Sequence, residues 1–555
     1  MAVPKTVSSA SRRETSMRLV RIIARYIALV LLVSQVLLAQ SPATTVLSSS
    51  NLPILIMDTH GRQIVDSPRI IADLGIIYNG SGQRNSVTDA FNNYNGKIAI
   101  ELRGSSSMAY PKKQYRFETK DALEEDEDVS LLGMPEENDW ILNGPFDDKT
   151  MIRNTLVYRL SNDMGRYASR TRFCELILND DYQGVYVLME KVKRDKNRVD
   201  ISKLNPDEIE GDDLTGGYII KLDKTSGENV AGWTSANSIY YQYDYPKPDE
   251  IVTQQKQYIR QFVTDFEALM KSSHWNDPVT GYPAMIDLDS FVDHFILNEF
   301  ARNIDGYRLS AYLYKDKDSK DGRLHAGPVW DFNLSFGKAW YPQDRHITTG
   351  WEVHHNTRLP DDSPKIPFWW IQLAHDPIFA GRVAERWSEL RTGLLDKDSL
   401  NHRIDLLADT LSEARERNST RWTEMGTLSV YQSEISYLKQ WISQRIDWID
   451  ANLTLLTSID NSSPGFIPDQ YTLEQNYPNP FNAVTRIEYG IPVAGSVSIE
   501  IFDIRGVKVA TIPDSPAFAG THRVEFDATN LPAGIYIYCL KTDHFKAMKK
   551  MTLLK

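Results

Sequence analysis

The sequence has few cysteines, no excess of positive charge and no long apolar run beyond its first forty residues. Two cysteines, Cys174 and Cys539, stand far apart among 555 residues, which excludes a disulfide framework and a thiolate metal site. A formal net charge of -12 argues against a nucleic-acid-binding protein, because phosphate contacts need a basic surface. The 41% hydrophobic and 25% charged residues are instead typical of a folded protein of two or more domains.

The one apolar run lies behind a basic leader at the N-terminus. Several arginines precede an apolar stretch that begins at Tyr26 and ends at Ala39. Polar residues interrupt this stretch, and a stable membrane span needs about 20 apolar residues. Residues 1–40 are therefore predicted to be a signal peptide with a cleavage site near Ala39, and a membrane anchor is the alternative.

The chain changes character near its middle. Residues 51–224 contain short alternating runs typical of strands, among them 97–102, 114–118, 172–178, 184–189 and 216–222. A helix is expected over residues 147–164, with Asp147 and Asp148 at its N-cap. Residues 251–455 carry helical periodicity, over 251–271, 288–302, 378–393, 398–416 and 431–453. The pattern predicts an α+β domain over 51–455, with a β-rich lobe, a helical lobe and a cleft between them.

The C-terminal part is predicted to be a separate all-β unit. Residues 456–470 form a polar linker rich in structure-breaking residues, and 471–555 alternate as strands with regular turn signals, which predicts a small β-sandwich. Prolines at 478 and 480 predict that strand register begins at Thr485. Gln475-Asn-Tyr-Pro-Asn-Pro-Phe-Asn482, Leu531-Pro-Ala-Gly-Ile-Tyr536 and the Lys549-Lys550 strand closely resemble the type A sorting domain of the type IX secretion system.

The resemblance of this unit implies where the protein goes. It implies export across an outer membrane by the type IX machinery, by way of the periplasm. The destination would be the medium or the outer cell surface, with the unit removed or used for anchoring. The alternative is an unrelated sandwich that binds substrate.

Two aspartates flank a predicted hairpin. Asp305 precedes the first strand and Asp331 follows the second, so the hairpin is expected to bring them close together. One carboxylate of such a pair can accept a proton from an attacking hydroxyl, while the other holds magnesium on a triphosphate. The order of Asp305, Ser310 five positions on, the hairpin and Asp331-Phe332-Asn333 is that of protein kinases, although the usual His-Arg-Asp triplet, the Gly-rich loop and a Walker A run are absent.

A short Gly/Ser loop lies upstream, between two predicted strands. It begins at Arg103, includes Ser105 and Ser106, and is followed by Lys112 and Lys113. Such a loop can turn backbone N–H groups toward phosphate, and a strand lysine can add charge. A plain hairpin is the alternative. Neighbouring lysines on a strand point to opposite faces, and which of the two points inward stays open.

Together these segments closely resemble the spore-coat-protein-H (CotH) family of atypical kinases, over roughly residues 50–455. The segments that carry the resemblance are Leu102-Arg-Gly-Ser-Ser-Ser107, Pro111-Lys-Lys-Gln-Tyr115, Gly184-Val-Tyr-Val-Leu-Met-Glu190, Gly216-Gly-Tyr218, Asn303-Ile-Asp305 and Trp330-Asp331-Phe332. The resemblance implies a two-lobed kinase-like fold that uses ATP and Mg²⁺ to phosphorylate Ser/Thr hydroxyls of a surface or secreted protein.

The resemblance also implies roles for single residues. Asp305 would be the catalytic acid and Asp331 the magnesium ligand. Lys112 or Lys113 would contact phosphate, and Glu190 would lie by the nucleotide. Two positions depart from the family pattern, because Ser310 stands where asparagine is frequent and Asn333 where aspartate is common. Both departures weaken the metal site, so a catalytically weak or inactive binding or scaffold protein is the alternative, and a secreted hydrolase is a third interpretation.

Two further clusters are interpreted as structural. The histidines at 346, 354 and 355, with Asp344 and Glu352, match no recognisable metal spacing, and neighbouring tryptophans indicate an aromatic loop packed on the helical lobe. The acidic run 316–322 has some features of a calcium loop, but Lys320 occupies a ligand position and no glutamate closes the loop, which favours a hairpin turn.

Overall fold

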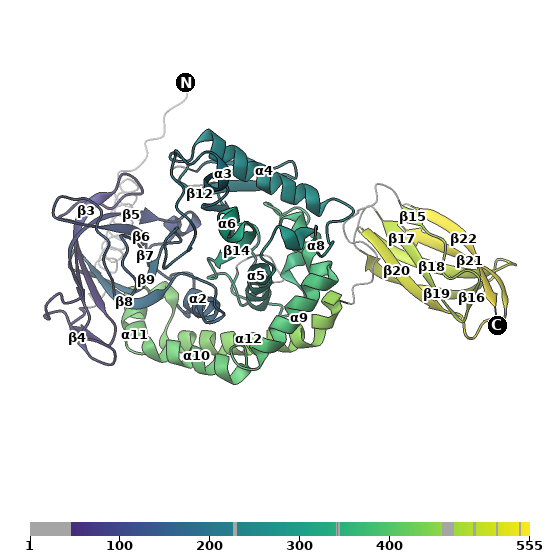
Figure 1. The fold of residues 1–555 in the computed structure, drawn as a ribbon. Helices are drawn as coiled ribbons and strands as arrows, with labels where there is room; N and C mark the ends of the chain where they lie inside the picture. Colours follow the sequence, from purple (N-terminus) through teal and green to yellow (C-terminus); the bar gives the residue numbers. More distant parts are fainter. Residues whose placement is uncertain are drawn as a thin grey trace, which may run out of the picture. The chain divides into compact units, whose positions relative to one another are not determined.

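A computed structural model describes residues 46–225, 230–339, 341, 345–457, 471–491, 495–517, 520–542 and 545–554. The predicted signal peptide at 1–40 and most of the predicted linker lie outside these residues. The chain is a mixed α+β protein, as predicted (Figure 1). Its segments group into two compact units. The first unit comprises Met1–Ile152, Arg170–Lys191 and Asp405–Ile435, and the second comprises Arg153–Ser169, Val192–Ile404 and Ser436–Lys555.

The first unit contains a closed barrel of seven strands. Its order is β2-β3-β5-β6-β7-β9-β8, and a parallel pairing of β8 with β2 closes the ring. The strands are β2 (Ile54–Asp58), β3 (Ile70–Ile77), β5 (Tyr94–Arg103), β6 (Gln114–Lys120), β7 (Asp139–Asn143), β8 (Thr171–Leu178) and β9 (Asp181–Glu190). Two short strands, β1 (Ser49–Ser50) and β4 (Asn85–Ser86), pair beside it. Predicted strands 97–102, 114–118, 172–178 and 184–189 lie within β5, β6, β8 and β9, whereas closure of the ring was not predicted.

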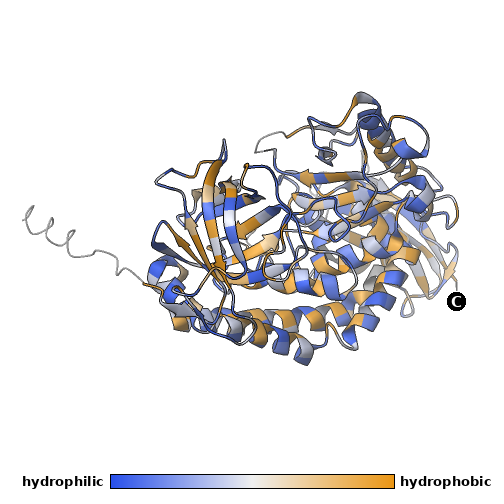
Figure 2. Cartoon of the chain, turned by 60° about the vertical axis from the view of Figure 1, so that its left-hand side comes forward, coloured by the Kyte–Doolittle hydropathy of each residue, from blue (hydrophilic) through white to orange (hydrophobic). Residues whose placement is uncertain are grey.

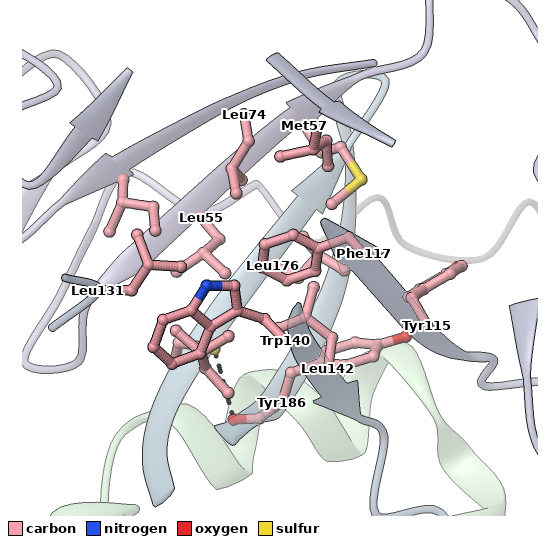
Figure 3. Packing of buried hydrophobic residues seen from close by; sticks show 14 of the residues in the cluster. Leu55, Met57, Leu74, Tyr115, Phe117, Leu131, Trp140, Leu142, Leu176 and Tyr186 are labelled. Atoms are coloured by element: carbon pink, nitrogen blue, oxygen red, sulfur yellow. Dashed lines mark hydrogen bonds between the residues drawn. The ribbon is translucent and has the colours of Figure 1, made fainter. Parts of the chain in front are cut away.

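Alternating apolar residues fill the barrel interior. Every second residue of β6 is buried, and Figure 2 shows hydrophobic and hydrophilic positions alternating along the barrel strands. In Figure 3, aliphatic side chains from β2, β3 and β8 point toward Phe117, Trp140 and Tyr186. Phe117 and Trp140 are fully buried, and the Trp140 indole donates to the carbonyl of Glu137 at 2.9 Å. The core therefore comes from period-two patterning, and closure removes the exposed sheet edges.

The second unit contains an antiparallel sheet of five strands, in the order β11-β12-β10-β13-β14. The strands are β10 (Tyr218–Asp223), β11 (Gly232–Thr234), β12 (Tyr240–Tyr245), β13 (Ser310–Lys315) and β14 (Leu324–Val329). The hairpin predicted between the two aspartates is β13 and β14, in which Ala311 pairs with Val329. The acidic run 316–322 turns this hairpin, with the short helix α6 (Asp318–Asp321), as predicted.

The helix expected over residues 147–164 begins later than predicted. Asp148 accepts hydrogen bonds from the amide and hydroxyl of Thr150 at 3.0 and 2.6 Å, and Met151 has a left-handed φ of 60°. These residues therefore form a turn, and α2 spans Arg153–Asp163. The aspartate at 148 closes that turn and does not cap the helix.

Helices are present at the predicted ranges 251–271, 288–302, 378–393 and 431–453, whereas the short helices at 211–214, 355–358 and 368–375 were not predicted. Predicted helix 398–416 is divided into α10 and α11 by residues 411–413. The helices are α3 (Gly211–Leu214), α4 (Thr253–Met270), α5 (Leu288–Ala301), α7 (His355–Arg358), α8 (Phe368–His375), α9 (Pro377–Arg391), α10 (Lys397–Thr410), α11 (Ala414–Arg421) and α12 (Leu428–Thr457). Short 3₁₀ turns are η1 (Ser106–Ala109), η2 (Tyr282–Ala284), η3 (Glu352–His354) and η4 (Thr423–Met425). Within the described residues, no helix is both long and apolar enough to span a membrane.

The C-terminal residues form two β-sheets around a shared apolar core. One sheet has the order β15-β17-β20 and the other β16-β22-β21-β18-β19. The strands are β15 (Thr472–Leu473), β16 (Phe481–Asn482), β17 (Val484–Ile491), β18 (Gly495–Asp503), β19 (Lys508–Ala517), β20 (Gly520–Asp527), β21 (Gly534–Thr542) and β22 (Lys546–Leu554). Strand pairing begins before the predicted Thr485, since Phe481 and Asn482 pair in parallel with β22. Pro480 comes just before this paired segment, so its missing N–H group costs no ladder hydrogen bond.

Candidate functional site

A tight loop between α5 and β13 carries Asp305. The helix ends at Arg302, whose left-handed backbone (φ 46°) turns the chain away from the helix axis. His294 on α5 contacts the Gly306 carbonyl through Nε2 at 3.1 Å. A Cβ at Gly306 would lie 1.7 Å from Oδ1 of Asn298, so only glycine fits here. The loop is therefore packed directly on the buried helix, in one fixed conformation.

Asp331 follows β14 in a second constrained turn. Its φ is 58°, which is unusual for aspartate, and its amide donates to the Tyr158 hydroxyl at 3.0 Å. The next amide, of Phe332, donates to Oδ1 of Asn154 at 2.6 Å. Trp330 stacks on Tyr158 with ring centroids 5.8 Å apart. Helix α2 therefore holds this turn through its side chains, and the Asp331 residue itself is exposed.

One amide side chain joins the two aspartate turns. Oδ1 of Asn303 accepts from the backbone N–H of Asp305 at 3.3 Å, and Nδ2 of Asn303 donates to the carbonyl of Asp331 at 3.4 Å. Asn303 is fully buried, so these contacts satisfy its polar atoms inside the protein. The hairpin thus brings the Asp305 and Asp331 segments side by side despite their separation in sequence.

The Asp305 carboxyl lies in a largely buried, charged environment. Only 14% of its side chain is exposed, and the Arg308 guanidinium lies 3.4 Å from its Oδ1. The hydroxyl of Tyr341 donates to the same oxygen at 3.4 Å. Burial raises the pKa of Asp305, and the nearby charge of Arg308, followed by that of Lys224, partly offsets this effect. A carboxyl with a raised pKa is a better proton acceptor than an ordinary aspartate.

The two other predicted metal ligands, Asn333 and Ser310, differ in their exposure to solvent. Asn333 is partly exposed two residues after Asp331. Ser310 begins β13, is buried, and its hydroxyl donates to the carbonyl of Leu309 at 2.6 Å. A hydroxyl that donates to the backbone keeps oxygen lone pairs for a cation, but its position is tied to the strand.

The structure separates the roles of the two predicted phosphate lysines. Lys112 is fully buried in the first unit, where Nζ donates to the Val185 carbonyl at 2.5 Å and to Oδ1 of Asn418 at 2.7 Å. Burial holds the pKa of Lys112 well below its usual range. Lys113 is partly exposed, and its Nζ donates to the Met108 carbonyl in the Gly/Ser loop at 2.7 Å. Lys112 therefore fastens α11 to strand β9, while Lys113 borders the loop.

The Gly/Ser loop contains a conformationally constrained glycine and a short 3₁₀ turn. Gly104 has a φ of 130°, and a Cβ there would lie 2.0 Å from Oγ of Ser107, so the loop requires glycine at this position. Ser105 precedes the short turn η1 and Ser106 begins it. The Arg103 guanidinium lies 3.5 Å from the Gln114 side-chain oxygen across the strand pair.

Glu190 ends strand β9 inside the first unit. Its carboxylate is fully buried and pairs with the Arg170 guanidinium at 2.8 Å, and it accepts from the Arg170 backbone amide at 2.9 Å. A buried carboxylate of this kind is compensated by its partner arginine.

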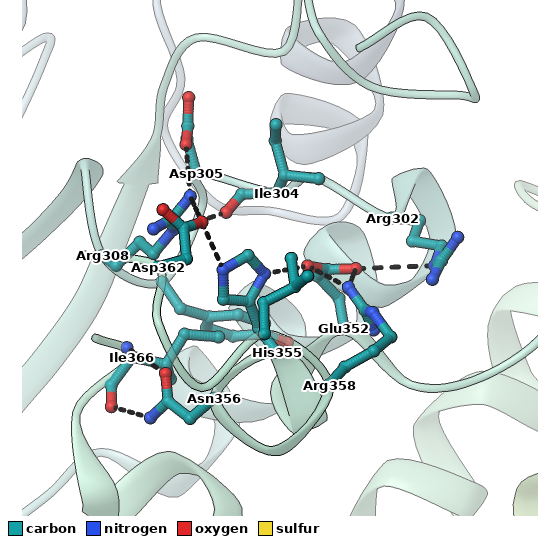
Figure 4. Close-up of polar contacts among 12 residues, drawn as sticks. Arg302, Ile304, Asp305, Arg308, Glu352, His355, Asn356, Arg358, Asp362 and Ile366 are labelled. Carbon is teal, nitrogen blue, oxygen red and sulfur yellow. Dashed lines mark hydrogen bonds and ion pairs between the residues drawn. The ribbon is translucent and has the colours of Figure 1, made fainter. Parts of the chain in front are cut away.

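Charged residues near Asp305, to which the sequence patterns assigned no catalytic or binding role, form a largely buried network in the second unit (Figure 4). His355, interpreted above as part of a packed aromatic loop, lies between the carboxylates of Glu352 and Asp362. Asp362 in turn pairs with Arg308. The signal available in the sequence was only the concentration of polar residues around position 355, without a spacing that indicates their partners.

A different group has the geometry of a cation site. In the described part of the chain, ligand atoms of Asp287, Asp321 and His325 lie within 4.8 Å of one another. The Arg323 guanidinium pairs with both carboxylates, at 3.1 Å from Asp287 and 2.7 Å from Asp321. That arginine already compensates the negative charge, and none of the predicted metal ligands belongs to this group.

Comparison with known protein families accounts for most of the chain. The model of the CotH kinase protein family matches residues 100–449, which is more than half of the sequence. The model of a secretion system C-terminal sorting domain matches residues 475–553, the region of the two C-terminal sheets. A search of curated proteins finds no match. The chain therefore belongs to the CotH kinase protein family, and it ends in a type IX sorting domain that indicates secretion or display at the cell surface.

Proposed function

We propose that the protein is an exported kinase that transfers the γ-phosphoryl group of ATP to Ser/Thr hydroxyls of a surface or secreted protein, with a two-lobed kinase-like catalytic domain. The observation that carries this proposal is the Asn303 bridge, which holds the Asp305 and Asp331 turns together in one sheet-and-helix scaffold. Membership of the CotH kinase family supports the same reaction class.

The proposal assigns separate tasks to the two aspartates. The buried Asp305, with its raised pKa, accepts the proton of the acceptor hydroxyl as that oxygen attacks the γ-phosphorus. The exposed Asp331, with Asn333 and Ser310, offers the oxygen donors that Mg²⁺ prefers. When bound there, magnesium would neutralise phosphate charge.

In the first unit, the proposal assigns phosphate contacts to the Gly/Ser loop. Ser105 and Ser106 offer backbone N–H groups, and Arg103 and Lys113 add positive charge. Glu190 is assigned a place beside the nucleotide, where its ion pair with Arg170 holds the carboxylate in position. Partial exposure favours Lys113 over Lys112 for this task, since a fully buried amine has no route to a ligand without leaving its bonds.

The test is phosphotransfer from ATP labelled at the γ-phosphate. The full mature chain is incubated with Mg²⁺, labelled ATP and a generic Ser/Thr acceptor protein, beside Asp305→Ala and Asp331→Ala variants. Label is expected on the acceptor only with the wild-type chain. Equal labelling by all three proteins would sink the kinase assignment, and release of free phosphate without protein labelling would favour a hydrolase.

One observation favours the second candidate, a kinase-fold protein with weak or no activity that acts in surface binding or as a scaffold. Ser310 stands where asparagine is frequent in the family that the chain resembles, and its hydroxyl donates to the Leu309 carbonyl. Isothermal calorimetry separates the two candidates, because a scaffold would take up no nucleotide in a Mg²⁺-dependent manner.

Substituting each lysine to alanine should give opposite results. Lys112→Ala is expected to lower the free energy of unfolding by at least about 2 kcal/mol, because it leaves the buried Val185 carbonyl without its donor and opens a cavity. Lys113→Ala should leave stability unchanged within about 0.5 kcal/mol and weaken ATP binding. Chemical denaturation measures the stability of each variant, and calorimetry measures its ATP binding. If Lys112→Ala weakened ATP binding and Lys113→Ala did not, Lys112 would be the nucleotide ligand.

A further inference from the structure

Arg308 is shared between two carboxylates, only one of which has a proposed catalytic task. Its side chain is fully buried, and Nη2 lies 3.4 Å from Oδ1 of Asp305 and 3.1 Å from Oδ2 of Asp362 (Figure 4). Nη2 also donates to the Tyr341 hydroxyl at 3.0 Å, while Nε donates to the Ile304 carbonyl at 3.0 Å and Nη1 to the Pro364 carbonyl at 2.9 Å. The guanidinium therefore cannot shift toward Asp305 without breaking bonds to its other partners.

His355 contacts Asp362 at the same carboxylate oxygen that pairs with Arg308. Nε2 of His355 lies 2.9 Å from Oδ2 of Asp362, and Nδ1 lies 3.0 Å from Oε1 of Glu352. The imidazole and the Glu352 side chain are both fully buried. Because both ring nitrogens face carboxylate oxygens, rotation of the ring would break one contact or both. The ring thus fixes the Asp362 carboxylate relative to helix α7.

The far end of this chain of contacts is anchored in the helical core. Arg358 contacts both oxygens of Glu352 at 2.9 Å, and the Glu352 amide donates to Oε2 of Glu299 at 2.6 Å. Glu299 belongs to α5, the helix that precedes the Asp305 loop. Helix α5 is therefore linked to Asp305 in two ways. The Asp305 loop follows α5 in the chain, and the charged network connects Asp305 to Glu299 on the same helix.

We propose that Asp362 is a positioning residue for Asp305, and that His355 fixes Asp362 in that role. Asp362 takes the shorter contact with Arg308 and keeps the guanidinium from closing onto Asp305 as a tight pair. A carboxylate locked in a tight pair with arginine is a poor proton acceptor, whereas one held at 3.4 Å keeps its orientation and its basicity. The charges of Lys224 and His355 and the Tyr341 hydroxyl also act on Asp305. This inference rests on the proposed kinase function.

The kinetic test compares Asp362→Asn with Asp361→Asn, a control that removes the neighbouring exposed carboxylate of the same loop. Asp362→Asn is expected to lower kcat about tenfold with the KM for ATP within about twofold, while the control matches the wild type. His355→Leu should reproduce the loss, and His355→Gln, which keeps a donor toward Asp362, should restore part of it. In an Asp305→Asn background the Asp362→Asn change should have no further effect on kcat. An equal loss in both backgrounds would overturn the positioning role.

A second measurement needs no catalytic activity and so separates failure of this inference from failure of the proposed function. Each single change, Asp305→Asn or Asp362→Asn, leaves Arg308 one carboxylate, while the double change leaves a buried guanidinium with neither. The double variant is therefore expected to lower Tm by more than the sum of the single changes. Additive shifts in Tm would show that the two carboxylates do not share Arg308, and the inference would fall even if the chain is an active kinase.

Discussion

Replacing Asp331 by asparagine is expected to reduce Mg²⁺-dependent ATP binding by at least about 100-fold, because the change removes the exposed carboxylate that the proposed site offers to the cation. The backbone of this turn is held by Tyr158 and Asn154, so the fold should be unaffected. Calorimetric titration with ATP, with and without Mg²⁺, measures the loss directly.

Asp305→Asn is the matched variant, with a different expected result. It should keep Mg²⁺-dependent ATP binding while kcat falls by about 10²–10⁴-fold, the range lost with a general base. Because burial raises the pKa of Asp305, the folded protein binds this proton more tightly than the unfolded chain, and the residue costs stability at pH values above that pKa. The neutral asparagine should therefore not lower Tm at pH 7. Loss of ATP binding in Asp305→Asn and its retention in Asp331→Asn would reverse the assigned roles.

Replacing Arg445 by methionine is expected to lower the free energy of unfolding by about 3–5 kcal/mol, the typical cost of breaking a buried ion pair from one side. Nη2 of Arg445 lies 3.2 Å from Oε2 of Glu299, and neither side chain is more than 1% exposed. Nη1 also donates to the carbonyls of Thr348 and Gly350 at 2.9 and 2.7 Å. Burial lowers the pKa of Arg445 to about 10, and the negative charges of Glu299 and Glu352 oppose this effect, so the guanidinium stays charged at pH 7.

Lys397→Met is the matched control. It removes the α10 partner of Asp447, a residue on α12, the helix that also carries Arg445. Lys397 pairs with Asp447 at 2.5 Å, but 65% of the Asp447 side chain is exposed, so the expected loss is at most about 1 kcal/mol. Denaturant unfolding of both variants, followed by tryptophan fluorescence, gives the comparison. If Arg445→Met cost no more than the control, Glu299 would have to be protonated in the fold, since burial raises its pKa and only the charge of Arg445 and backbone donors oppose this.

Local sequence patterns were sufficient to place the two proposed catalytic aspartates. Apolar alternation on both sides of an acidic turn predicts a hairpin, and a hairpin returns the chain to its starting point. The segments that carry Asp305 and Asp331 were therefore expected to lie near each other, and Asn303 joins them in the structure. Helical periodicity located α4, α5 and α9 to within two residues. Helix α2 began later than predicted because the side chain of Asp148 bonds within a turn, a choice that depends on the left-handed Met151.

The position of each lysine and the role of His355 could not be predicted in the same way. Lys112 and Lys113 are adjacent, and only closure of the barrel with α11 against β9 decides which amine is buried against Asn418. His355 begins α7 and contacts Asp362 seven residues later. Its proposed role depends on Arg308, 47 positions earlier in the chain, through the Asp362–Arg308 ion pair.

The sequence by itself determined the family, the sorting domain and the hairpin between Asp305 and Asp331, because each depends on residues close together in the chain or on an ordered set of motifs. Only the tertiary structure decided the closed barrel, the burial of Lys112 and the sharing of Arg308 between Asp305 and Asp362. The physical reason is that burial and charge compensation depend on groups brought together from distant segments, and their pairing leaves no periodic or spaced signal in the sequence.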